Sequence, residues 1–142
     1  MGYLKWKCTI QKKEDNKLIF SLLRFGDICK KRIDLSPDEE FMQVCGRSMS
    51  KGFNVAAHRH IETNRQTNLT QEAWVLLRGS VRARFYDLDD SFLCEREISS
   101  GDVIVLYRGG HSLEVLEDDT VFYEFKNGPY FGVNKDKEKI NE

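Results

Sequence analysis

Short runs of alternating apolar and polar residues, separated by turn-forming residues, occupy almost the whole sequence. Two clear examples are SVRARFYDL at 80–88 and FLCEREI at 92–98. A period of two residues is typical of strands that bury one face, whereas an amphipathic helix spaces its apolar residues by three or four. About ten such runs at near-regular spacing predict an all-β sandwich or barrel.

The remaining segments add little helix to this pattern. We expect strands at 3–10, 18–25, 26–35, 43–49, 53–60, 72–79, 80–88, 92–98, 103–107, 111–116 and 120–126. The segment SPDEEFMQV at 36–44 predicts at most one short helix, because Ser36 is a suitable N-cap and Pro37 suits the first helical position. The charged tail NKDKEKINE is expected to fray or to lie on the surface.

Charge and composition exclude several classes of partner. Twenty-two basic residues nearly cancel 23 acidic ones, so the net charge of -1 predicts binding neither to nucleic acid nor to an anionic membrane surface. No apolar run approaches the roughly 20 residues of a membrane span, and the first residues lack a signal-peptide core. The four cysteines form no C-x-x-C pair, which indicates reduced thiols in a cytoplasmic protein.

His58 and His60 stand one residue apart in the predicted strand 53–60. Side chains two residues apart in a strand point the same way, so both imidazoles can converge on one point. Neighbouring strands can bring Glu72 and His111 to that point, and imidazoles with a carboxylate suit a divalent transition metal. An H-x-H pair alone is equally typical of an exposed surface, but all three histidines of the chain fall in predicted strands.

The spacing of these residues resembles the two motifs of the cupin superfamily. In the first motif a glycine, five residues, H-x-H, a spacer, a glutamate and six residues lead to a glycine, and here the matching residues are Gly52, His58, His60, Glu72 and Gly79. In the second motif the matching residues are Gly101, Tyr107, Gly109 and His111. The resemblance covers about residues 40–127.

Three departures from the family pattern concern the proposed ligands. The spacer between His60 and Glu72 holds eleven residues and is longer than usual, Tyr107 replaces a proline, and the loop before His111 is one residue short. The long spacer leaves Glu62 as an alternative carboxylate ligand. The six residues between Glu72 and Gly79 match the motif and favour Glu72.

The resemblance implies a single cupin domain over 1–142. In this arrangement N-terminal strands and a short helix (1–39) precede a double-stranded β-helix barrel, and a tail (128–142) follows it. It also implies a homodimer and one divalent transition metal (Zn, Fe, Mn or Ni), held by His58, His60, Glu72 and His111. The stretch GGHSLEVLEDDTVFYEFKNGPY looks like small bacterial cupins of sugar-nucleotide and surface-polysaccharide gene clusters, which implies a carbohydrate ligand.

Four further residues are candidates for ligand contact or catalysis. Arg65 lies in the polar run 61–71, which we interpret either as a ligand-binding rim or as a solvated loop. Arg82 and Arg84 share one strand face, which is usually solvated but could bind phosphate. Tyr107 could donate a proton near the barrel mouth, with core packing as the alternative.

The residues and the resemblance leave three functions open. The first is an isomerase or epimerase-like enzyme that acts on a sugar or sugar nucleotide and uses the metal to polarise a carbonyl or hydroxyl. The second is an iron-dependent dioxygenase, and the third is a non-catalytic module that binds or senses a carbohydrate. Fold alone does not decide among them.

Overall fold

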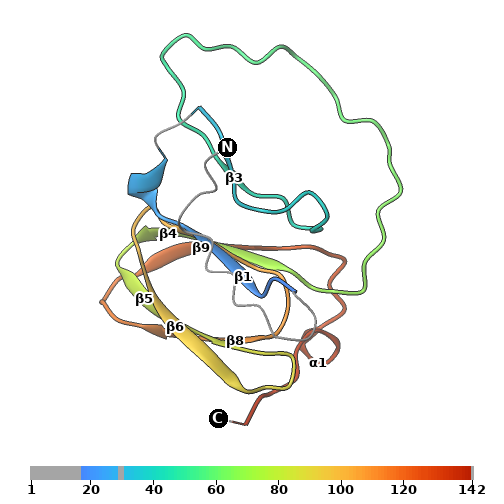
Figure 1. Cartoon of the computed structure of the whole chain (residues 1–142), viewed down its shortest axis with the longest axis vertical. Coiled ribbons are helices and arrows are strands. Elements are labelled where there is room, and N and C mark those ends of the chain that lie inside the picture. Colours follow the sequence, from blue (N-terminus) through green and yellow to red (C-terminus); the bar gives the residue numbers. More distant parts are fainter. Residues whose placement is uncertain (1–16, 29–30, 142) are drawn as a thin grey trace.

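Two antiparallel sheets face one another across the main core (Figure 1). The computed structural model describes residues 17–28 and 31–141. The first sheet has the order β1-β7-β4-β9, and the second has the order β6-β5-β8. The strands of the first sheet are β1 (Phe20–Leu23), β7 (Val103–Leu106), β4 (Glu72–Arg78) and β9 (Val121–Lys126). Those of the second are β6 (Phe92–Ser99), β5 (Ser80–Tyr86) and β8 (Gly110–Val115).

Two short helical elements and one small sheet complete the described chain. A 3-10 turn, η1, spans Phe25–Asp27, and one helix, α1, spans Val133–Asp136. The strands β2 (Ile33–Asp34) and β3 (Cys45–Gly46) pair with one another in a separate two-stranded sheet. The all-β class predicted from the sequence is therefore confirmed.

In the first sheet, β1, β7 and the first half of β4 are buried on both faces, whereas β9 is largely exposed. Trp74, Leu76 and Ile104 face the second sheet, where the rings of Phe20 and Phe85 stack with centroids 3.8 Å apart. The other face of the sheet packs against the segment around β2, and its buried residues are Leu18, Leu23, Ile33, Leu35, Ala73, Val105 and Tyr107. Burial on two faces explains why VIVLY at 103–107 is apolar throughout instead of alternating.

The expected helix at 36–44 is wrong. The segment forms turns, with a hydrogen bond from the Glu40 N–H to the Pro37 carbonyl (3.1 Å). The Ser36 hydroxyl accepts a hydrogen bond from the N–H of Val44 (3.0 Å) instead of capping a first helical turn. A helix this short gains too few internal hydrogen bonds to compete with such longer-range contacts within the chain.

The later strands agree with the sequence analysis, but two earlier ones do not. Predicted strands at 72–79, 80–88, 92–98, 103–107, 111–116 and 120–126 correspond to β4 through β9. The strand expected at 53–60 is absent, because that segment lies in extended, exposed chain without a strand partner. Among the described residues of the run 26–35, only Ile33 and Asp34 lie in a strand, β2, and the run 3–10 lies outside the described residues.

Candidate functional site

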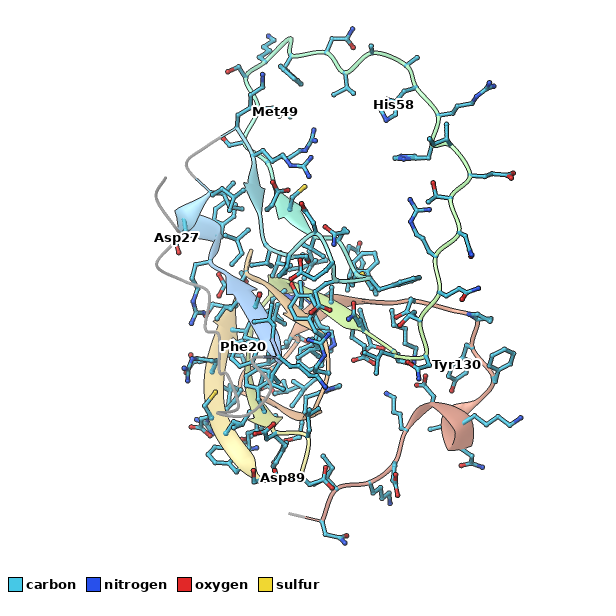
Figure 2. All side chains as sticks on the ribbon, turned by 45° about the vertical axis from the view of Figure 1, so that its right-hand side comes forward. Phe20, Asp27, Met49, His58, Asp89 and Tyr130 are labelled. Atoms are coloured by element: carbon cyan, nitrogen blue, oxygen red, sulfur yellow. The ribbon has the colours of Figure 1, made fainter. Side chains whose placement is uncertain are left out.

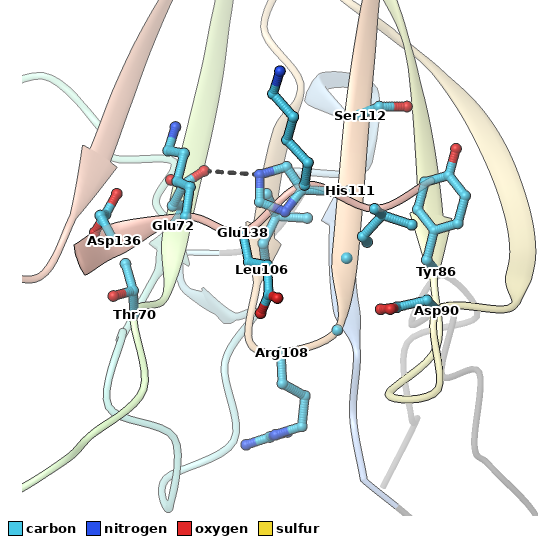
Figure 3. A pocket seen from close by; sticks show the side chains of 15 residues that line it. Thr70, Glu72, Tyr86, Asp90, Leu106, Arg108, His111, Ser112, Asp136 and Glu138 are labelled. Carbon is cyan, nitrogen blue, oxygen red and sulfur yellow. Dashed lines mark ion pairs between the residues drawn. The ribbon is translucent and has the colours of Figure 1, made fainter. Parts of the chain in front are cut away.

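A cavity of about 570 Å³ opens at one end of the two facing sheets (Figure 3). It is bounded by the start of β4, the segment from the end of β7 into β8, and the C-terminal segment 136–140. Its lining combines both signs of charge with polar groups, including Glu72, Asp90, Arg108, His111, Ser112 and Lys137. A concave site with several convergent polar groups is the usual setting for a small-molecule ligand.

Glu72 and His111 meet inside this cavity, as Figure 3 shows. The Glu72 Oε2 atom lies 3.2 Å from the Nε2 atom of His111, and their side chains are 5% and 31% exposed. Despite this short distance, Oε2 is buried without a hydrogen bond of good geometry. The His111 ring packs edge-on against Trp74, with centroids 5.4 Å apart, which fixes its orientation.

The electrostatic surroundings keep Glu72 ionised. Burial by itself raises the pKa of the Glu72 carboxyl. The close approach and the charge of His111, with smaller contributions from Lys137 and Lys126, outweigh burial and hold the pKa of Glu72 below its ordinary value. The cavity therefore contains a carboxylate anion next to an imidazole nitrogen, which is half of a metal-ligand set.

His58 and His60 lie far along a different segment. We call residues 47–70 the arm; it arcs away from the sheets and returns to the start of β4 (Figures 1 and 2). Both histidines are exposed, and their rings sit next to one another with centroids 5.6 Å apart. The two imidazoles are therefore neighbours on the arm, away from the cavity, where we expected them to converge.

The structure thus brings together Glu72 and His111 and does not bring His58 and His60 to them. Within residues 17–28 and 31–141, no cluster of three or more His, Cys, Asp or Glu side chains has the geometry of a metal site. The unsatisfied, buried oxygen of Glu72 beside a histidine nitrogen nevertheless fits the requirements of a cation ligand. Glu62, the alternative carboxylate, is exposed on the arm.

Tyr107 lies in the core and not at the cavity mouth where we expected it. The side chain is fully buried, and its hydroxyl donates a hydrogen bond to the Ser36 hydroxyl (3.0 Å). Burial raises the pKa of the phenol above its ordinary value, although the hydrogen bond with Ser36 opposes this. This position agrees with core packing, the alternative for Tyr107, and a catalytic role gains no support from it.

The three candidate arginines lie outside the cavity. Arg65 is exposed on the arm. Arg82 and Arg84 form an ion-pair ladder across the outer face of the second sheet, each pairing with Glu114 (3.1 and 3.0 Å) and with Glu95 (3.7 and 3.6 Å). Partners on two neighbouring strands satisfy these guanidinium groups, as expected for a solvated strand face.

Sequence reasoning missed two contributors to the cavity. Arg108 lines it and makes a two-pronged ion pair with Glu40 (2.9 and 2.8 Å). The C-terminal segment, expected to fray or to lie on the surface, lies across the cavity, where Ile140 contacts Gly110 and Asp136 pairs with Lys126 (3.0 Å). The only available signal was the isolated apolar Ile140 within a charged tail.

Comparison of the sequence with protein-family models, with curated proteins and with solved structures finds no match. Across the described part of the chain, no helix has both the length and the apolar character needed to cross a membrane.

Proposed function

We propose that this chain is a metal-binding cupin whose cavity takes a sugar or a sugar nucleotide. The observation that carries the proposal is the buried, unsatisfied Glu72 oxygen facing His111 in a cavity of about 570 Å³. A buried carboxylate oxygen without a hydrogen-bond donor is costly, and a bound cation would remove that cost. His58 and His60 are the donors that would complete the ligand set.

The strand pairing supports a double-stranded β-helix. Moving outward from the turn between β6 and β7, β5 pairs with β8, and β4 pairs with β9. Along the chain, β4, β7 and β9 lie in the first sheet and β5, β6 and β8 in the second, so every connection except that between β5 and β6 crosses from one sheet to the other. Such nested antiparallel pairs are what a long hairpin makes when it wraps into a jelly roll.

A metal held here would supply a Lewis acid able to polarise a sugar carbonyl or hydroxyl. Glu72 offsets part of the positive charge, and Trp74 holds the His111 ring in one orientation. Lys137 and Lys139 on the C-terminal segment line the same cavity and provide cations for the phosphates of a sugar nucleotide. An isomerase or epimerase-like reaction is the activity we favour.

Metal analysis of untagged protein tests this proposal. We expect about one divalent transition metal per chain, and a clear loss of that metal in His111→Ala and in His58→Ala. A panel of nucleotide sugars, followed by calorimetry and by NMR of the products, then separates turnover from binding alone. Iron with substrate-dependent oxygen uptake would favour a dioxygenase instead, and protein that never holds metal would overturn the proposal.

A further inference from the structure

The arm is an unusually long exposed segment for a folded domain. All 24 consecutive residues from 47 to 70 are exposed, and none lies in a strand or helix. The side chains of His58, Thr63 and Arg65 form hydrogen bonds with backbone carbonyl groups just two positions away in the sequence. Connections of this length without structure of their own are uncommon in compact domains and are usually functional.

The arm nevertheless carries the alternation of a strand. Phe53, Val55, Ala57 and Ile61 occupy one side of the extended chain, whereas His58 and His60 occupy the other. Phe53, Val55 and Ile61 are all among the exposed large apolar side chains. A segment with this pattern gains stability only when its backbone pairs with a sheet edge and its apolar side is covered.

A matching edge is present on β9. This strand hydrogen-bonds to β4 on one side, and no described strand pairs with its other side. Its outward-facing residues form an exposed apolar strip, with Val121, Tyr123 and Phe125 at 38%, 58% and 53% exposure. Leu77 on β4 is exposed beside this strip. Such an edge is a template for pairing with another chain.

The opposite face of β9 leads to the cavity. In the register of β4 and β9, Lys126 stands directly opposite Glu72, and Glu124 stands opposite Trp74. If the arm paired with the free edge of β9, its apolar side would extend the strip of Tyr123 and Phe125. The same alternation would put His58 and His60 on the face that carries Glu72.

The arm of the same chain is poorly placed to do this. Asn127, just after β9, anchors the end of the arm. Its side chain accepts a hydrogen bond from the Gln71 N–H (2.8 Å) and donates one to the Leu69 carbonyl (3.1 Å). If segment 53–60 folded back onto β9 of its own chain, it would run antiparallel to β4. Because β9 is also antiparallel to β4, the segment and β9 would then pair in parallel. A second copy can approach with antiparallel polarity, which the rest of the sheet uses.

We infer that two copies of this chain exchange arms, so that each arm delivers His58 and His60 to the Glu72–His111 cavity of the other copy. This inference rests on the proposed metal function. The arm alone supplies 24 residues, and a stable protein interface uses about 20–30 residues a side. Because each copy gives one arm and receives one, the contact is self-complementary and closes as a dimer.

Mixing two defective variants tests the exchange directly. The first variant, His58→Ala/His60→Ala, has an intact cavity; the second, Glu72→Gln/His111→Ala, has an intact arm. Each alone should hold little zinc. Refolded together in equal amounts, they should regain about one quarter of the wild-type zinc per chain, because about half of the dimers are mixed and each mixed dimer has one intact site. Zinc should co-purify with the mixed dimer when two different tags are used.

Zinc bound by the wild type but absent from the mixture would overturn arm exchange while leaving the proposed metal site in place. Wild-type protein without metal would overturn the proposed function and, with it, the composite site. An interface variant adds a measurement that does not depend on metal. Tyr123→Ser should weaken the dimer at least about tenfold by sedimentation analysis, whereas Phe92→Ser, an equally exposed ring (58%) on β6, should not. A wild-type chain that sediments as a monomer would also overturn the exchange.

Discussion

The Glu72 Oε2 and His111 Nε2 atoms lie 3.2 Å apart, although β5, β6 and β7 separate them in the sequence. Glu72 opens β4 in the first sheet, whereas His111 is the second residue of β8 in the second sheet. The pair therefore joins the two sheets at the end where the cavity opens. An ionised carboxylate with one unsatisfied oxygen at such a place is a strong electrostatic attractor for a cation.

Replacing Glu72 by Gln should weaken metal binding by at least about tenfold. The substitution removes the negative charge beside His111 and preserves the shape of the side chain. The measurement is a competition titration of zinc against a chromophoric chelator. Glu62→Gln is the matched control, since Glu62 was the alternative ligand and is exposed on the arm. The assignment would be reversed if Glu62→Gln weakened binding and Glu72→Gln did not.

Strands β4 to β9 could be predicted from the sequence because each carries its information locally. The alternation in β5 and β6 matches one more buried and one more open face, and the apolar run of β7 matches burial on both faces. Turn residues such as Gly79, with φ at +78°, separate the strands. The convergence of Glu72 and His111 could also be predicted, because the motif spacing places them in separate strands that the family resemblance brings to one site.

The segments 36–44 and 53–60 could not be predicted correctly, because what decides them lies elsewhere in the fold. The hydroxyl of Ser36 has the right chemistry for a helix cap, but the backbone N–H of Met42 donates instead to the side chain of Gln71 (2.7 Å), next to β4. The segment around His58 and His60 alternates as a strand should, yet periodicity does not say whether a sheet edge is available within the same chain. Local pattern predicts strand capacity, and tertiary pairing decides its use.

Tyr107→Phe tests whether this residue packs or catalyses. At neutral pH the variant should lose about 1 kcal/mol of stability, because the hydrogen bond to Ser36 is removed from the core. The pKa of Tyr107 is raised in the folded state, so its stabilising contribution is complete below the unfolded value of about 10 and is lost as the pH rises through the folded value. The wild-type advantage in urea unfolding should therefore shrink above about pH 10. A packing role leaves metal and ligand binding unchanged in this variant, and a large loss of either would restore the catalytic assignment.

Asp102 should be one of the most sensitive polar residues of the fold. Its carboxylate accepts hydrogen bonds from the N–H of Phe25 (3.0 Å), the N–H of Ser99 (3.0 Å) and the guanidinium of Arg24 (2.7 Å). Asp102→Ala leaves these donors without their partner and should lower the free energy of unfolding by about 3 kcal/mol. Asp118→Ala, at an exposed turn, should change it by less than about 0.5 kcal/mol. Equal effects of the two variants in chemical unfolding would contradict this role for Asp102.

The ladder on the second sheet predicts a measurable titration. The hydrogen bond from Arg84, with a further contribution from the charge of Arg82, holds the pKa of Glu114 below its ordinary value against the opposing effect of burial. A lowered pKa means that the contribution of this carboxylate is present above the unfolded value and is lost as the pH falls through the folded value. NMR titration of Glu114 should show a pKa that returns toward the ordinary value in Arg84→Gln. An unchanged pKa would mean that the ladder is not formed in solution.

Limited trypsin digestion should cut the arm first and should report its docking. Arg59 and Arg65 lie in fully exposed, extended chain, whereas Arg82 and Arg84 lie inside β5 with ion-pair partners. Proteolysis of an exposed segment follows the population of its undocked form, so dilute protein in chelator should be cleaved at Arg59 and Arg65 before any strand is cut. Zinc at about ten times its dissociation constant should slow these two cuts about tenfold, because only the undocked arm is a substrate. His58→Ala/His60→Ala keeps both arginines and serves as the control, in which zinc should have no effect on the rate. Cleavage that zinc does not slow in the wild type would mean that the arm stays undocked when metal is bound, and that its histidines are not ligands.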